Sequence, residues 1–310
     1  MIGVGPLTGQ TDHRWLPFSR RVDNLTVSRH YAWWGLSMRK RRADGTLAER
    51  VPAYRRMMPY IMTGKNTSAV YFKTTIDMEN ALEFLENPPR ELEGLLTPTV
   101  LFLRAASKVL HEFPRLNRFV SGRRLYQRDG VYISFSAKKA FSEDAPIVVI
   151  KMRFDHNESF VQMARRVHEE LQRGRSDEPS YTDRETAFLL KLPRSALRFV
   201  VWLQSVLDYF GLLPKRFIET DLFYASAFVA NLGSIGLDAV YHHLYEYGNI
   251  PIFATIGRIQ PMLAVRDGEV VVRRMVELKI TFDERIEDGF YAAKAIARLK
   301  ELMENPHELL

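Results

Sequence analysis

Hydrophobic and polar residues recur along this chain in two patterns, which predict an ordered series of strands and helices. Alternating runs predict strands over 124–128, 131–136 and 270–280, a run rich in β-branched and aromatic residues predicts one over 68–77, and a continuous apolar run predicts a buried strand over 147–152. Apolar residues spaced as on one helix face predict helices over 78–86, 98–110, 160–171 and from residue 290 onwards. Two more short strands are predicted at 22–27 and 31–36, in a region that is otherwise weakly patterned.

Turn residues set the limits of several of these elements. Thr97 and Pro98 begin a long helix, because threonine caps a first turn well and proline is favoured at the first helical position. Asp129-Gly130 separates two alternating runs, and this dipeptide is typical of a tight turn between paired strands. The sequence therefore predicts a β-hairpin that joins 124–128 to 131–136.

A long apolar run over 192–214 interrupts the alternation of elements. Arg198 and Asp208 fall inside it, which argues against a membrane-spanning helix. Basic residues flank the run at Lys191, Arg194, Lys215 and Arg216. This pattern suits an interfacial helix at an anionic membrane surface, that is, a peripheral membrane contact. The alternative is a helix that packs on its own core or on a neighbouring subunit.

Composition narrows the classes of function. The chain has 310 residues, a net charge of +7 and no cysteine, so disulfides, thiolate metal sites and a cysteine nucleophile are excluded. The cluster over 39–42 is the densest basic segment, and its simplest interpretation is a solvated hairpin tip. No nucleic-acid-binding motif accompanies it, so no nucleic acid is expected as a partner. The N-terminus lacks the pattern of a signal peptide, and we expect a cytoplasmic protein.

The most informative motif lies near the C-terminus, where Asp283, Glu284, Arg285, Asp288 and Gly289 follow a strand and precede a helix. Three further turns come earlier in the chain: Pro114-Arg115-Leu116-Asn117, Asn231-Leu232-Gly233 and Ile256-Gly257-Arg258. Together and in this order they resemble the catalytic domain of the 2-oxo acid dehydrogenase (dihydrolipoyl) acyltransferases and chloramphenicol acetyltransferase.

The resemblance implies a fold and an assembly. The fold is an α/β, chloramphenicol-acetyltransferase-like two-layer sandwich, in which helices cover a mixed β-sheet. We expect this domain over 51–310, an N-terminal arm over 1–50 and a helical insertion at about 174–221. Members of the family form homotrimers or higher three-fold assemblies, with the site between subunits. Residues 1–50 are too few for a lipoyl domain, so a complete core subunit of a 2-oxo acid dehydrogenase complex is not expected.

The resemblance also implies a chemistry, and two positions depart from it. Family members move an acyl group from a coenzyme A thioester to a thiol or hydroxyl, with a histidine as general base. Glu284 stands at the position of that histidine, and Ala230 stands at the position of a serine or threonine that binds the oxyanion. A glutamate with a pKa of about 4.3 is a poor match for a thiol near 8.5, although burial raises the pKa of a carboxyl group. The loss of one oxyanion donor costs a few kcal/mol.

Candidate site residues follow from these positions. The catalytic candidates are Glu284, Asp288 and His243, the substrate-binding candidates are Asn231, Ser234 and His242, and Arg285 and Gly289 are expected to be structural. The resemblance implies that Asp288 forms an ion pair that organises the site and that Gly289 lets the chain turn tightly. His242 and His243 are alternatively packing or surface histidines. Their spacing is not that of a helical zinc pair, so no metal is predicted.

Two functions remain open at this stage. The first is acyl transfer from a coenzyme A thioester to an apolar or lipid-like acceptor at an atypical site. The second is a non-catalytic homologue that acts as a trimeric scaffold or binding protein. Glu284 and Ala230 favour the second function, whereas Asn231, Ser234 and Asp288 favour the first.

Overall fold

The computed structural model describes residues 41–138, 147–175 and 190–310. The predicted strands at 22–27 and 31–36 lie outside these ranges. No helix within the described ranges is both long and apolar enough to cross a membrane.

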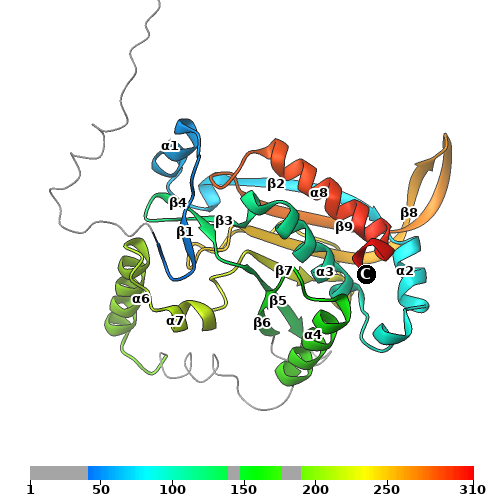
Figure 1. Cartoon of the computed structure of the whole chain (residues 1–310), viewed down its shortest axis with the longest axis horizontal. Coiled ribbons are helices and arrows are strands. Elements are labelled where there is room, and N and C mark those ends of the chain that lie inside the picture. The colour runs from blue at the N-terminus through cyan, green and yellow to red at the C-terminus, as the bar shows by residue number, and fades with distance from the viewer. Residues whose placement is uncertain (1–40, 139–146, 176–189) are drawn as a thin grey trace, which may run out of the picture. The chain divides into compact units, whose positions relative to one another are not determined.

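Nine strands and seven helices are described here, with the labels of Figure 1. The strands are β1 (Gly45–Leu47), β2 (Ala69–Asp77), β3 (Arg118–Ser121), β4 (Arg124–Arg128), β5 (Val131–Lys138), β6 (Ile147–Phe154), β7 (Ala227–Asn231), β8 (Ile252–Arg266) and β9 (Glu269–Asp283). The helices are α1 (Ala53–Ile61), α2 (Glu79–Glu86), α3 (Pro98–Glu112), α4 (Phe160–Arg175), α6 (Arg194–Tyr209), α7 (Lys215–Thr220) and α8 (Gly289–Glu304). Most predicted elements are confirmed, including the Thr97 cap, whose hydroxyl accepts the amide of Val100 at 3.2 Å.

A six-stranded mixed sheet forms the centre of the fold, with the order β2-β9-β8-β7-β5-β6. β7 is parallel to both β5 and β8, and the other neighbours are antiparallel. A second, three-stranded sheet has the order β1-β4-β3. The predicted mixed sheet is therefore confirmed.

Helices α3, α4 and α8 cover one face of the large sheet, as Figure 1 shows. Inward-facing residues of alternate positions, such as Ile133 in β5, Val229 in β7 and Leu278 in β9, pack against these helices. Phe228 and Phe253 point to the other face, where they join a smaller cluster with Leu244 from the segment after β7. The two faces of one sheet thus bury different sets of residues, as alternating side chains require.

The predicted hairpin at Asp129-Gly130 is wrong. β4 already has β1 and β3 along its two edges, so β5 has no free edge to pair with and enters the large sheet instead. Gly130 has a φ of +83°, which suits the change of direction between the sheets. The true hairpin joins β3 and β4 through Gly122 and Arg123, with φ of 55° and 57°.

Residues 41–50, which the sequence assigns to the arm, are part of this compact unit. The solvated tip predicted for the basic cluster is wrong for Arg42, which is 4% exposed. Its guanidinium Nε lies 2.9 Å from Asp44 Oδ1, and its Nη2 lies 2.7 Å from Asp208 Oδ1 in α6. A buried arginine needs such carboxylate partners, because an unpaired charge is costly away from water.

Helix α6 confirms the prediction of a helix within the apolar run. Two of its polar residues face the body of the protein: Gln204 donates to the Tyr224 hydroxyl at 2.5 Å, and Asp208 accepts from Ser121 as well as from Arg42. Leu207 packs beside Leu213, Ile218 and Tyr224. No described residue of α6 lines the cavity beside Thr99, Ser136 and Asn231, so the helix forms no lid over that cavity.

Candidate functional site

The turn after β9 is fixed by a buried ion pair. The Asp283 carboxylate accepts from Arg285 Nε at 2.9 Å and from Nη2 at 2.8 Å, and both side chains are almost completely buried. Ser68 donates to the same carboxylate at 3.1 Å. This two-point contact holds both side chains in one geometry. The residue between them, Glu284, is therefore carried on a rigid turn.

Arg55 in α1 joins this turn to the start of α8. Its Nη1 donates to the Glu284 carbonyl at 2.9 Å, and its Nη2 lies 3.7 Å from Asp288 Oδ2. Arg55 Nε lies 3.5 Å from Glu287 Oε1. The other Asp288 oxygen accepts the amide of Tyr291 at 2.9 Å and so caps α8. Arg55 thus supplies the cation for the ion pair that the resemblance implies for Asp288.

The backbone of Glu284 is held by a hydrogen bond, whereas nothing in the parts of the chain that the structure describes requires a glycine at position 289. The Glu284 amide donates to the Ser68 carbonyl at 2.9 Å, while its half-buried carboxylate has no hydrogen-bond or ion-pair partner among the described residues. Gly289 is the first residue of α8, with no positive φ, and a Cβ there would meet only the Phe72 ring at an ordinary distance. The tight turn implied for Gly289 is therefore not what the structure shows.

The two predicted histidines lie on the segment that covers the second face of the sheet. The His242 ring stacks on Phe253 at 3.9 Å between centroids and on the His243 ring at 4.4 Å. Burial lowers the pKa of His242. Thr281 donates to the His242 carbonyl at 2.5 Å, which brings the histidine backbone to the end of β9. No contact joins either imidazole to Glu284 in the described part of the chain.

Lys65 connects the histidine segment to the Glu284 turn. Its ammonium group donates to the carbonyls of Tyr245 and Gly248 at 2.6 and 2.7 Å. Burial lowers the pKa of Lys65 to about 8. The next residue, Asn66, exchanges two hydrogen bonds with the backbone of Leu244, at 2.8 and 2.9 Å. Residues 64–68 thus tie the histidine segment and the Glu284 turn into one cluster.

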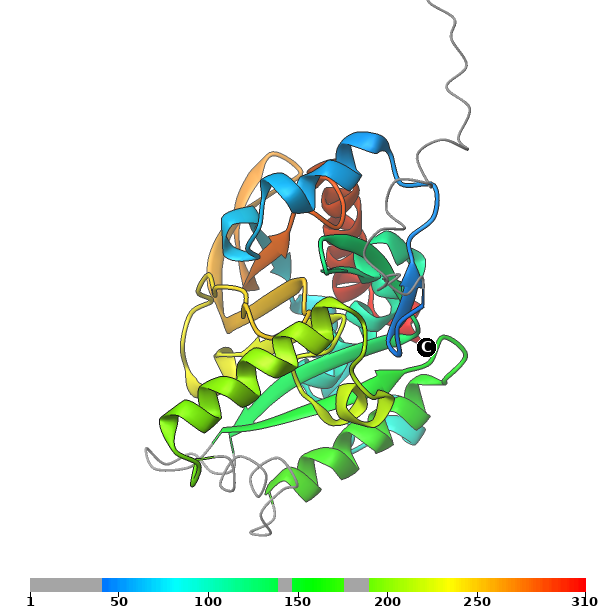
Figure 2. The same cartoon turned by 90° about the vertical axis from the view of Figure 1, so that its left-hand side faces the viewer.

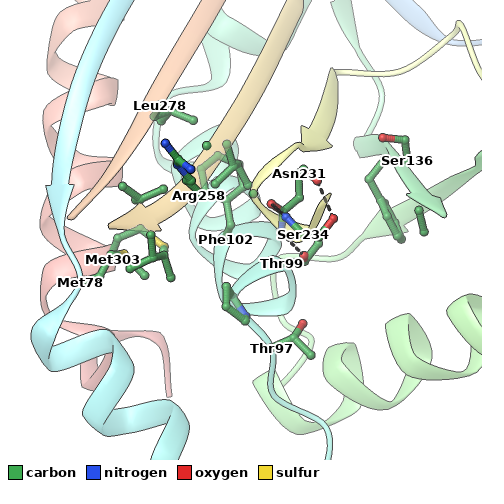
Figure 3. Close-up of a pocket in the computed structure, with 18 of the residues that line it drawn as sticks. Met78, Thr97, Thr99, Phe102, Ser136, Asn231, Ser234, Arg258, Leu278 and Met303 are labelled. Carbon is green, nitrogen blue, oxygen red and sulfur yellow. Dashed lines mark hydrogen bonds between the residues drawn. The ribbon is translucent and has the colours of Figure 1, made fainter. Parts of the chain in front are cut away.

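A cavity of about 580 Å³ lies at the other end of β7. Its polar lining includes Thr97, Thr99, Ser136, Asn231, Ser234 and Arg258 (Figure 3). Apolar residues such as Phe102 and Leu278 form much of the remaining wall. This volume is in the range of small-molecule sites. Within the described ranges, no group of three histidine, aspartate or glutamate side chains could hold a metal ion.

Asn231 and Ser234 are held in a compact turn at this cavity. Asn231 Nδ2 donates to Thr99 Oγ1 at 2.8 Å, and its Oδ1 accepts the Ser234 amide at 3.1 Å (Figure 3). A Cβ on Gly233 would collide with the carbonyl of Gly257, so the turn and the Ile-Gly-Arg strand touch backbone to backbone. The absence of a side chain at Gly233 makes this close approach feasible, and Gly257 in turn leaves room for the backbone of Ala239.

Ser136 stands directly beside Ala230. The two residues are in register on the parallel strands β5 and β7, so their side chains share a face of the sheet. Ser136 lines the cavity, and its hydroxyl has no hydrogen-bond partner among the described residues. A free hydroxyl therefore lies one strand away from the position where the family is expected to carry one.

The predicted site residues fall into two groups that one chain cannot bring together. Asn231 is level with Ile256 in β8, and Ile256 is level with Leu278 in β9. Leu278 precedes Glu284 by six residues, which is about 20 Å along a strand. The first group, at the Glu284 turn, also includes Arg285, Asp288 and the histidine segment. The second group is Asn231 and Ser234 with Ser136.

The family model for 2-oxoacid dehydrogenases acyltransferase (catalytic domain) matches residues 46–188 and 215–310, which is more than half of the chain. The chain therefore belongs to this family. The unmatched residues 189–214 contain α6. Among curated proteins, the dihydrolipoyllysine-residue acetyltransferase component of the pyruvate dehydrogenase complex of Bacillus subtilis is 34% identical over 86 residues, which are 28% of this chain and 19% of the relative. The match thus spans about a fifth of that relative.

Solved structures share the fold. A probable dihydrolipoamide acetyltransferase from Listeria monocytogenes aligns with a TM-score of 0.56 and 18% identity over 83% of this chain and 94% of its own. The cubic core of the pyruvate dehydrogenase multienzyme complex gives 0.53 and 20%, over 84% and 93%. Chloramphenicol acetyltransferase gives 0.51 and 11%, over 84% and 99%. These likenesses confirm the predicted fold class.

Sequence reasoning missed Arg55, Lys65 and Ser136. The two cations lie in segments with no clear pattern, and each is buried against residues more than 150 positions away. Ser136 was assigned to a strand, but only the register of β5 against β7 places it beside Ala230.

Proposed function

We propose that this protein transfers an acyl group from a coenzyme A thioester to an apolar or lipid-like acceptor, at a site that forms between two copies of the chain. The observation that carries the proposal is the separation of the two residue groups. Among the described residues the Glu284 carboxylate has no hydrogen-bond or ion-pair partner. The lining of the cavity beside Asn231 and Ser136 includes His168, but none of the predicted catalytic residues Glu284, Asp288 and His243. In a pair of copies, the Glu284 turn of one chain would lie against the cavity beside Asn231 and Ser136 of the other chain.

In this scheme Glu284 of one copy takes the proton from the acceptor hydroxyl or thiol. The acceptor atom then bonds to the thioester carbonyl carbon, and the tetrahedral oxyanion is bound by the Ser136 hydroxyl of the other copy. The carbon–sulfur bond breaks, and the departing thiolate recovers the proton from Glu284. A carboxylate is a weaker base than an imidazole by about 2 pKa units, or about 3 kcal/mol, so a slow reaction is expected.

Two features of the chain support a ligand site rather than a filled core. The cavity has a volume of about 580 Å³ and a wall that is mostly apolar with a few convergent polar groups. Asn231 and Ser234 keep the geometry of the turn even though Ala230 carries no hydroxyl. An apolar wall suits an acyl chain, because each buried methylene contributes about 0.8 kcal/mol.

A non-catalytic scaffold is the second candidate function. The observation that favours it is the pair of replacements, Glu284 for the family histidine and Ala230 for the oxyanion donor, as the resemblance assigns them. As a scaffold, the protein would form the same assembly of copies but would not transfer an acyl group.

Thioester turnover separates the two candidates. The chain has no cysteine, so with an alcohol acceptor a thiol reagent reports only the coenzyme A that is released. Transfer to a thiol acceptor leaves the number of free thiols unchanged, so it would be followed by chromatography of the acyl-coenzyme A that remains. Acetyl-, octanoyl- and palmitoyl-coenzyme A would be offered with alcohol and thiol acceptors to the wild type, to Glu284→Gln and to Glu284→His. Glu269→Gln, in the exposed β8–β9 turn, is the matched control.

The proposal expects turnover by the wild type and by Glu269→Gln, loss in Glu284→Gln at unchanged thermal stability, and equal or higher turnover in Glu284→His. If wild type and Glu284→His are both inactive with every thioester, the scaffold function replaces the proposal.

A further inference from the structure

Helix α6 turns its apolar side outward. Phe199 and Trp202 are 57% and 58% exposed, Val201 is 46% exposed and Tyr209 is 41% exposed. We refer to these four residues as the α6 aromatic face. None of the helix residues is fully buried, and Figure 2 shows α6 in front of the rest of the chain, with no described element across it.

This orientation is fixed by the polar side of the same helix. Asp208 is held by two hydrogen bonds from Arg42, at 2.6 Å to its carbonyl and 2.7 Å to its carboxylate. Gln204, one turn earlier, donates to Tyr224. A helix of an ordinary surface protein places its apolar stripe inward. In α6 the hydrogen bonds of Gln204 and Asp208 point inward, so the fold itself holds the apolar side of the helix outward.

The composition and surroundings of the face match those of a helix at a lipid surface. Aromatic rings with an apolar body are favoured at the boundary between lipid and water. The Phe199 and Trp202 rings lie side by side, with centroids 5.7 Å apart. Five exposed basic residues lie in the same stretch of chain, on α6 or just before or after it: Lys191, Arg194, Arg198, Lys215 and Arg216. The only acidic residue over 190–216 is Asp208, which Arg42 neutralises.

The helix is also an addition to the fold that the family shares. The family model passes from residue 188 to residue 215, so α6 and its aromatic face lie in the part of the chain that the model leaves out. Contacts between copies that are common to the family do not require this segment. A partner of α6 is therefore expected to be particular to this protein.

We propose that the α6 aromatic face docks on an anionic lipid surface, with its basic neighbours on the lipid headgroups. Charge favours this occupant over a second copy at α6, because a second copy seated there would bring the same basic residues to the contact and repel the first. An anionic membrane attracts the five basic residues through its surface potential. The inference needs no catalysis, so it stands or falls separately from the acyl transfer.

Vesicle flotation tests the proposal with the full chain. The wild type would be mixed with vesicles of phosphatidylcholine alone and with vesicles that also contain phosphatidylserine, at low and physiological salt. The test variant is Phe199→Ser with Trp202→Ser. The matched control is Leu263→Ser with Val272→Ser, which removes two residues of 75% and 66% exposure from the β8–β9 hairpin. Both changes are at exposed positions, and circular dichroism would verify the fold.

We expect flotation of the wild type with the anionic vesicles only, weakened by salt. Partitioning should fall about tenfold or more in the Phe199/Trp202 variant, and it should stay unchanged in the control. Replacement of Lys191, Arg194 and Arg198 by glutamine should also reduce it. The proposal is overturned if the wild type stays unbound with anionic vesicles or if both serine variants lose binding equally. It is also overturned if the Phe199/Trp202 variant lowers only the mass of the oligomer in light scattering, because a second copy would then be the occupant.

Discussion

Arg55 and Asp288, 233 positions apart in the chain, lie with Nη2 and Oδ2 at 3.7 Å from each other, while the second oxygen of Asp288 caps helix α8. One carboxylate therefore serves both the ion pair and the helix cap. Because Asp288 is 47% exposed, the ion pair itself contributes little to stability, and the cap contributes more.

The two roles of Asp288 can be separated by substitution. Asp288→Asn keeps an oxygen that caps α8 and removes the charge, so it should lower the free energy of unfolding by less than about 1 kcal/mol. Asp288→Ala removes both roles and should cost about 1 to 2 kcal/mol. Urea unfolding of the two variants checks this. Equal losses would mean that the charge, and not the cap, is what Asp288 contributes.

The contact between Arg42 and Asp208 predicts how α6 is held. Asp208→Ala leaves the buried Arg42 guanidinium with Asp44 as its remaining carboxylate, which should cost about 2 to 4 kcal/mol. Amide hydrogen exchange over residues 194–209 should become faster, while exchange in β8 and β9 should change little. Ser205→Ala, on the exposed side of the same helix, is the control. Unchanged exchange over α6 in Asp208→Ala would contradict this anchoring.

Lys65 predicts a dependence of stability on pH. Its pKa is lowered by burial from 10.5 to about 8, so between these values the unfolded chain binds the proton more strongly than the folded chain. The contribution of Lys65 to stability should therefore be constant below about pH 8 and rise between pH 8 and 10.5, by about 3 kcal/mol in total.

Urea unfolding of wild type and Lys65→Met at pH 7, 8, 9 and 10 isolates this contribution. The difference in unfolding free energy, wild type minus variant, should grow with pH above 8. A difference that falls or stays level over that range would contradict a lowered pKa of Lys65 in the folded chain.

If the wild type turns over a thioester, substitution of Ser136 tests whether this residue binds the oxyanion. Ser136→Ala should lower turnover about 100-fold, which is typical for the loss of one oxyanion donor. Ala230→Ser places a hydroxyl on the neighbouring strand, one register position across, and should restore much of the activity to Ser136→Ala. Full activity in Ser136→Ala alone would remove this residue from the mechanism.

The sequence located most strands and helices because alternation and helical spacing reveal which side of an element is buried. It could not reveal which strands become neighbours. The Asp129-Gly130 hairpin fails for this reason: β1, distant in sequence from β3, occupies the second edge of β4. The order of strands depends on contacts that no local pattern encodes.

The candidate site shows the same limit. Glu284, Asp288 and Asn231 were recognisable because they lie in motifs with fixed spacing. Arg55 and Lys65 resemble surface cations in the sequence, and only their buried partners in the folded chain reveal otherwise. The sequence left open whether the apolar side of α6 faces inward or outward, because the Arg42 that orients the helix lies 166 positions away from Asp208.

Cross-linking between copies tests the central claim, that the Glu284 turn and the cavity beside Ala230 meet only when two chains associate. The absence of native cysteine allows Glu284→Cys and Ala230→Cys to be combined in one chain and treated with a short bis-maleimide. Within one chain Ala230 is level with Lys279, which precedes Glu284 by five residues, or about 17 Å along the strand, and this is beyond the reach of such a linker. We predict covalent dimers and larger species on a denaturing gel for the double variant, and only monomer for each single variant. A double variant that stays monomeric on the gel, although both thiols are labelled, would contradict a site formed between copies.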